Sequence, residues 1–132
     1  MKKYLFTFCA LVMPLLSMAQ LPASQSISSV GFIEGGVGLD ESDAIKMESM
    51  HWPLLMEFSQ ANGKKSEWVS DVFLVVKDAK GNQVFTHQVD GPLILLDLKP
   101  GRYSAESTYD ERKKVTNFYI ENGQHKTLDV SW

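Results

Sequence analysis

From Leu54 to the C-terminus, short apolar segments alternate with turn signals at close spacing. The clearest turn signals are Asn62-Gly63, Asp90-Gly91-Pro92, Pro100-Gly101 and Asn122-Gly123. Between the turns lie seven segments of strand length, most of which repeat with a period of two residues. Short strands joined in this way are typical of a sandwich or barrel, and not of an α/β fold. The sequence therefore predicts an all-β domain, rich in strands, with one short helix near its N-terminus.

The alternation also predicts which side chains face the core. It is cleanest in residues 102–109, where four residues are expected to point inward: Tyr103, Ala105, Ser107 and Tyr109. In the last strand, Leu128, Val130 and Trp132 are expected inside. Residues 69–77 are apolar on both faces, which predicts a central strand that is covered on both sides.

The one predicted helix runs from Asp40 to about Met50. Asp40 is expected to cap its first turn, and Pro53 to end it, because the residue before a proline avoids helical angles. Ala44, Met47 and His51 fall on one face at helical spacing. A helix this short is stable only when it packs against the rest of the domain.

The first 19 residues predict a secretory signal peptide. Lys2 and Lys3 precede an apolar stretch, and small residues follow it, so cleavage is expected between Ala19 and Gln20. The apolar stretch is too short to span a bilayer, and no transmembrane segment is expected after cleavage. The sequence therefore predicts that the protein is exported from the cytoplasm.

Cleavage is expected to leave a flexible segment, residues 20–29, followed by one β-sandwich domain, residues 30–132. The single cysteine, Cys9, lies in the signal segment, so the domain has no disulfide and no thiol nucleophile. The chain carries a net charge of −3, and loss of Lys2 and Lys3 makes it more negative. Net negative charge repels nucleic acid phosphates, so a nucleic acid partner is not expected.

The motifs of common active sites are missing from the sequence. The glycine-rich segment 35–38 has neither the spacing of a dinucleotide-binding loop nor a Gly-Lys-Ser/Thr sequence. His51, His87 and His125 show no metal-binding spacing, and no Gly-x-Ser-x-Gly sequence is present. The sequence therefore predicts no catalytic residue, no metal ligand and no cofactor, and a protein that is not an enzyme.

Two sets of residues carry a family resemblance. The first set is residues 72–76, Asp78 with Gly81, and residues 98–103; it resembles carboxypeptidase regulatory-like domains. The second set is residues 35–38, Glu41, Asp90-Gly91-Pro92 and Trp132; with it, the chain is similar to small exported proteobacterial proteins that carry such a domain. The resemblance implies a seven-stranded transthyretin-like or immunoglobulin-like sandwich, a periplasmic location and an accessory role without an active site.

Aromatic residues are the remaining indication of a ligand site. Tyr103, Tyr109 and Trp132 occupy inward positions and are assigned to the core. Trp68 lies at a loop end, beside Glu67 and after Lys64-Lys65. It is the candidate ligand-binding residue, with partial burial at the start of a strand as the alternative interpretation.

Three functions stay open at this stage. The first is a noncatalytic periplasmic module that binds an unidentified envelope protein. The second is a carbohydrate-binding module of the envelope, for which Trp68 would contact the glycan. The third is a small envelope hydrolase, or an inhibitor of one.

Overall fold

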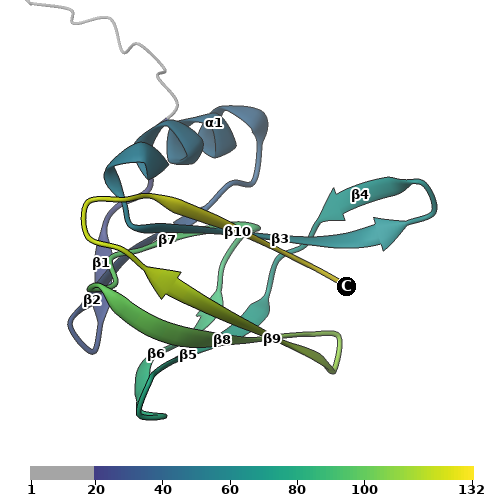
Figure 1. Ribbon diagram of the computed structural model, residues 1–132. Helices are drawn as coiled ribbons and strands as arrows, with labels where there is room; N and C mark the ends of the chain where they lie inside the picture. The colour runs from purple at the N-terminus through teal and green to yellow at the C-terminus, as the bar shows by residue number, and fades with distance from the viewer. Residues whose placement is uncertain (1–19) are drawn as a thin grey trace, which may run out of the picture.

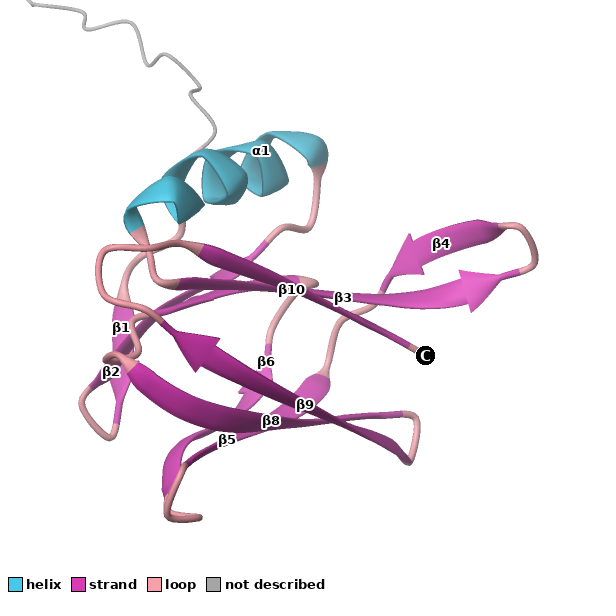
Figure 2. Ribbon diagram, in the orientation of Figure 1, coloured by secondary structure: helices cyan, strands magenta, loops and turns pink. Residues whose placement is uncertain are grey.

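The computed structural model describes residues 20–132, and the predicted signal peptide lies outside this range. Within it, ten strands form two sheets that pack face to face, and one α-helix lies on the outer side of the larger sheet (Figures 1 and 2). The prediction of an all-β sandwich with one short helix is confirmed. The predicted count of seven strands is wrong.

The larger sheet contains six strands and brings together both ends of the described chain. Its order is β1 (Gln25–Ile27), β2 (Val30–Gly35), β7 (Leu93–Leu96), β3 (Leu54–Asn62) and β10 (Lys126–Ser131), with β4 (Lys65–Trp68) paired to β3. The pairs are antiparallel except β3 with β10, which run parallel in the register Glu57 to Asp129. The β3–β4 hairpin extends away from the body of the sandwich (Figure 1).

The smaller sheet contains four antiparallel strands. Its order is β6 (Gln83–Val89), β5 (Val72–Asp78), β8 (Gly101–Tyr109) and β9 (Arg112–Ile120). The tight turn between β5 and β6 uses Gly81 at a φ of 82°, which favours glycine, as the sequence predicted. The Asp78 carboxylate accepts hydrogen bonds from the amides of Lys80 and Asn82, and these bonds lower the pKa of Asp78.

The main core lies between the two sheets and agrees with the predicted alternation. Ala105 and Ser107 are fully buried, and Tyr103 and Tyr109 pack at its margin. In β10, Val130 is buried, while Leu128 and Trp132 pack against the core. Trp132 also donates a hydrogen bond from Nε1 to the carbonyl of Arg112 (2.9 Å), which ties the two sheets together at this end.

The helix α1 (Leu39–Glu48) forms where it was predicted, but a different face is buried. A 3₁₀ turn, η1 (Ser49–His51), follows it. Ser42, Ile45 and Ser49 face the sheet, while Met47 is 76% exposed. An apolar pattern cannot predict this face, because two of its residues are serines. Their hydroxyls donate to the carbonyls of Leu39 and Lys46, so they can be buried. The predicted face with Ala44, Met47 and His51 is therefore wrong.

The start of the helix also differs from the prediction. Gly38 occupies the N-cap position without a side-chain hydrogen bond, and Asp40 lies inside the first turn. The Glu41 carboxylate instead accepts a hydrogen bond from the amide of Gly36 (2.8 Å). Negative side chains in the first turn still stabilise the helix through its dipole.

Three segments differ from their predicted structure. Strand β1 lies in the segment predicted to be a flexible tether, where it pairs with β2. Strand β4 lies partly in a predicted loop, because the Asn62-Gly63 turn closes a hairpin on β3. Strand β5 is central in its sheet, yet only one of its faces is covered, so the prediction of two covered faces is wrong.

In the described part of the chain, no helix is long and apolar enough to cross a membrane.

Candidate functional site

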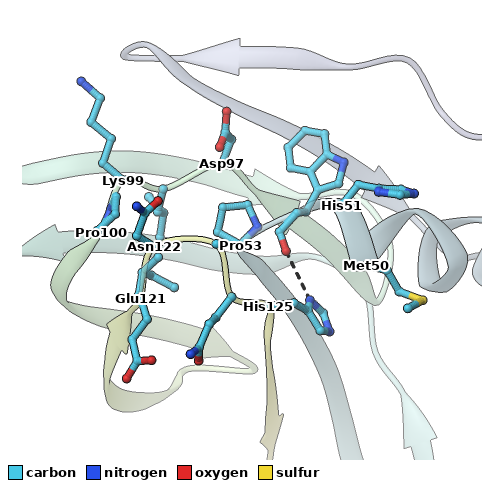
Figure 3. Close-up of a pocket in the computed structure, with 14 residues that line it drawn as sticks. Met50, His51, Pro53, Asp97, Lys99, Pro100, Glu121, Asn122 and His125 are labelled. Carbon is cyan, nitrogen blue, oxygen red and sulfur yellow. Dashed lines mark hydrogen bonds between the residues drawn. The ribbon is translucent and has the colours of Figure 1, made fainter.

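A cleft of about 360 Å³ opens at one end of the sandwich, where three connections far apart in sequence meet. Figure 3 shows the side chains that line it, from the end of η1, the β7–β8 connection and the β9–β10 connection. Its polar side chains include His51, Asp97, Lys99, Glu121 and His125. The cleft therefore brings together two of the three histidines, which the sequence separates by more than seventy residues.

His125 is held by the protein in a way that uses both ring nitrogens. Its Nδ1 donates to the carbonyl of Trp52 (3.2 Å), and its Nε2 lies 3.3 Å from the Thr127 hydroxyl (Figure 3 draws the first contact). His51 and His125 point in different directions in the same view. Within residues 20–132, no group of three or more histidine, cysteine or acidic residues is arranged to hold a metal ion. This geometry suits His125 to fixing the β9–β10 connection.

His87 connects the two sheets. Its Nε2 lies 2.8 Å from the Glu34 carboxylate, which also accepts a hydrogen bond from the amide of Asp90. The ring packs beside Phe32 and Phe85, with centroids 4.9 and 5.9 Å away. His87 thus braces the margin of the core, and the sequence could not show this because Glu34 is 53 residues away.

The glycines on which the family resemblance depends meet at one corner of the larger sheet. Gly91 has a φ of 106°, and a Cβ there would lie 2.3 Å from the carbonyl oxygen of Gly35. A side chain at Gly35 would likewise collide with the Glu41 carboxylate. The backbones at the end of β2 and before β7 can approach this closely only because residue 91 is glycine. This close contact fixes the positions of β2, β7 and α1 relative to one another.

Trp68, the predicted ligand residue, lies at the end of β4 and is 45% exposed. The ammonium of Lys46, on α1, lies 4.9 Å from the centre of its ring. The same ammonium lies 3.7 Å from the Glu57 carboxylate on β3. Burial, and then the neighbouring Asp129, raise the pKa of Glu57, while Lys46 acts in the opposite direction.

The outer face of the four-stranded sheet carries a second group of exposed side chains. Strand pairing places Phe73, Val75 and Lys77 of β5 beside Glu106 of β8, and Val115 and Tyr119 of β9 on the same side. We call this surface the open face. Phe73, Val115 and Tyr119 are 42, 58 and 46% exposed, and Lys77 forms an ion pair with Glu106 at 3.4 Å. No described segment lies over this surface (Figures 1 and 2).

A hollow of about 820 Å³ adjoins the open face near the β5–β6 turn. Its lining includes Lys77, Arg102, Ser104, Asn117 and Tyr119, and extends to Tyr103. Burial raises the pKa of Tyr103, helped by the charge of Asp78, and its hydroxyl donates to the carbonyl of Lys99. Sequence reasoning did not single out the open face. The signal for it in the sequence is the set of apolar outward residues of β5, which instead predicts a covering layer.

Comparison with protein-family models found no match, and comparison with curated proteins found none either. The resemblance to carboxypeptidase regulatory-like domains therefore stays a prediction.

Proposed function

We propose that the chain is a noncatalytic binding module of the bacterial periplasm that holds a partner protein on the open face. The observation that carries the proposal is the joint exposure of Phe73, Val115 and Tyr119 on one uncovered sheet face. Strand pairing puts the three residues in different rows of the sheet, with Glu106 and Asn117 between them, so a partner would meet apolar and polar side chains together. The adjoining hollow gives the surface a shape that a projecting side chain of a partner can fill.

The charges around the open face indicate the chemistry of that partner. Lys77, Arg102 and Lys113 point outward from the sheet, together with one acid, Glu106, which is already paired with Lys77. The chain as a whole is acidic, with a net charge of −3. This positive area on an acidic molecule favours a protein surface that presents carboxylates beside apolar side chains.

Site-specific photo-cross-linking in the periplasm tests the proposal. A photoreactive residue in place of Val115 is expected to capture one acidic protein, while the same residue in place of Met47 captures none. Met47 is a matched control because it is apolar and more exposed, but lies on α1. Capture from both positions equally, or from Met47 alone, contradicts the assignment of the open face.

Affinity for the captured protein is the second part of the test. Val115→Glu adds a negative charge to the positive area, and is expected to weaken binding about tenfold or more. Met47→Glu is expected to leave the affinity unchanged. Binding should also weaken as salt rises, because solvent-exposed charges are screened. Equal effects of the two substitutions would exclude the open face as the docking surface.

The periplasmic part of the proposal depends on residues 1–19 and is tested separately. A fusion of the full chain to alkaline phosphatase is expected to be active, since that enzyme folds only in an oxidising compartment. Replacing Ala19 with a bulky residue is expected to leave an uncleaved precursor. An inactive fusion that stays in the cytoplasm would refute the location without bearing on the open face.

A further inference from the structure

A second surface, on the larger sheet, combines an aromatic ring on β4 with polar side chains from α1, β3 and β10. Trp68 of β4 lies opposite Ser59 of β3, and Ser59 lies opposite Ser131 of β10. Side chains of directly paired residues point to the same side of a sheet. The three residues therefore form one row across three strands on the outer face, over a span of about 10 Å.

The next row on the same face is acidic. Glu57 of β3 and Asp129 of β10 are direct partners, two residues along from Ser59 and Ser131. The ammonium of Lys46 lies above this row, 3.7 Å from the Glu57 carboxylate. Donors and acceptors of hydrogen bonds thus lie beside the indole on a surface that α1 leaves uncovered. We call these residues the Trp68 surface: Lys46, Glu57, Ser59, Trp68, Asp129 and Ser131.

We propose that the Trp68 surface binds a β-linked oligosaccharide, because the extended shape of such a chain matches a straight row of side chains over about 10 Å. A pyranose whose hydroxyls are all equatorial has an apolar face of C–H groups and a polar rim. The apolar face packs on an indole ring, and the rim hydroxyls bond to carboxylates, serine hydroxyls and an ammonium. The Trp68 surface offers these two kinds of contact side by side, and the sugar would pack on the indole face opposite the Lys46 ammonium.

The ion pair of Lys46 with Glu57 keeps the polar groups in place before a sugar arrives. The Lys46 ammonium contacts both the indole and the carboxylate, so it fixes their relative position. A surface ordered in advance loses less conformational freedom on binding. This proposal is independent of the open face, because the two surfaces lie on the outer sides of different sheets.

Titration of the protein with cellohexaose and chitohexaose, followed by calorimetry, tests the proposal. At least one of these β-linked oligomers is expected to bind, and maltohexaose, which is α-linked, is expected to bind more weakly. Trp68→Ala should weaken binding about tenfold or more, and Trp68→Phe much less, because Phe keeps an aromatic face. Phe73→Ala, an aromatic truncation on the open face, is the matched control and should have no effect.

Asp129→Asn provides a second variant should Trp68→Ala fold poorly. Asp129 is exposed on an edge strand and lies beside Glu57, so its replacement removes a like charge and should not lower the thermal unfolding midpoint. It is expected to weaken sugar binding severalfold, because the amide is a poorer acceptor than the carboxylate. The proposal is overturned if neither β-linked oligomer binds at about 10 mM, if maltohexaose binds best, or if binding survives Trp68→Ala in a folded protein.

Discussion

The outer faces of the two sheets both carry apolar residues, but only one of the two faces is covered by another element. On the six-stranded sheet, Ile33, Leu55, Leu93 and Leu95 lie under α1, and Ile45 of the helix is fully buried against them. On the four-stranded sheet, Phe73, Val115 and Tyr119 have no covering element among the described residues. A sheet face is buried only if the chain supplies a layer for it. The face without a layer leaves its apolar residues in contact with solvent, and it is the surface that we propose to bind a partner.

The largest expected effect is on the covered face. Ile45→Ala is predicted to lower the free energy of unfolding by about 2–4 kcal/mol, because it removes a fully buried side chain and leaves a cavity. Met47→Ala, in the same helix, should change it by less than about 0.5 kcal/mol, because Met47 is exposed. Urea denaturation measures both values. Equal losses would mean that the helix does not pack as described.

Ser107→Ala is expected to stabilise the inner side of the four-stranded sheet. The Ser107 hydroxyl is fully buried and has no hydrogen-bond partner within residues 20–132. Its removal eliminates the desolvation cost, so the free energy of unfolding should rise by about 1 kcal/mol. Thermal unfolding of the variant checks this. A loss of stability would indicate that a bound water satisfies the hydroxyl.

Glu57→Gln is expected to change how stability depends on pH. Because the folded state raises the pKa of Glu57 above its ordinary value of 4.5, the folded state holds this proton more tightly than the unfolded state does. Its contribution to stability is therefore greatest below pH 4.5 and is lost as the pH rises through the folded pKa. The variant should gain stability relative to the native protein over that rise. Glu111→Gln, in the β8–β9 turn, controls for the loss of one charge.

The smallest expected effect on stability is on the open face. Phe73→Ser and Tyr119→Ser should each lower the free energy of unfolding by at most about 1 kcal/mol, since 42 and 46% of these residues are already exposed. Chemical denaturation of each variant gives this value. A loss near that of Ile45→Ala would show that these residues stabilise the fold, and would remove the contrast between the two faces.

The inward residues of the sandwich could be predicted from the sequence, because a period of two assigns Tyr103, Ala105 and Val130 to one side without knowledge of their neighbours. The buried face of α1 could not, since Ser42 and Ser49 bury hydroxyls that bond to the helix backbone. Periodicity identifies buried positions only where the side chains are apolar. It does not identify buried polar side chains that form hydrogen bonds to their own helix.

The candidate sites show a further limit of sequence reasoning. The position of Trp68 at a loop end made it a candidate, but Lys46 lies over its ring only because α1 packs there. Asp129 joins the same sheet face through the parallel pairing of β10 with β3. The apolar run in β5 predicted two covered faces, which is wrong, whereas the equally apolar β7 is buried on both faces. A strand alone does not specify whether another layer exists, and that layer decides between core and binding surface.

The central claim is that the open face is a binding surface, and hydroxyl-radical footprinting of the protein in intact cells tests it most directly. Purified protein should be oxidised readily at Phe73, Tyr119 and Met47, because all three are exposed. In cells, Phe73 and Tyr119 should be protected severalfold while Met47 reacts as before. Equal oxidation of all three residues in cells and in the purified protein would contradict the account.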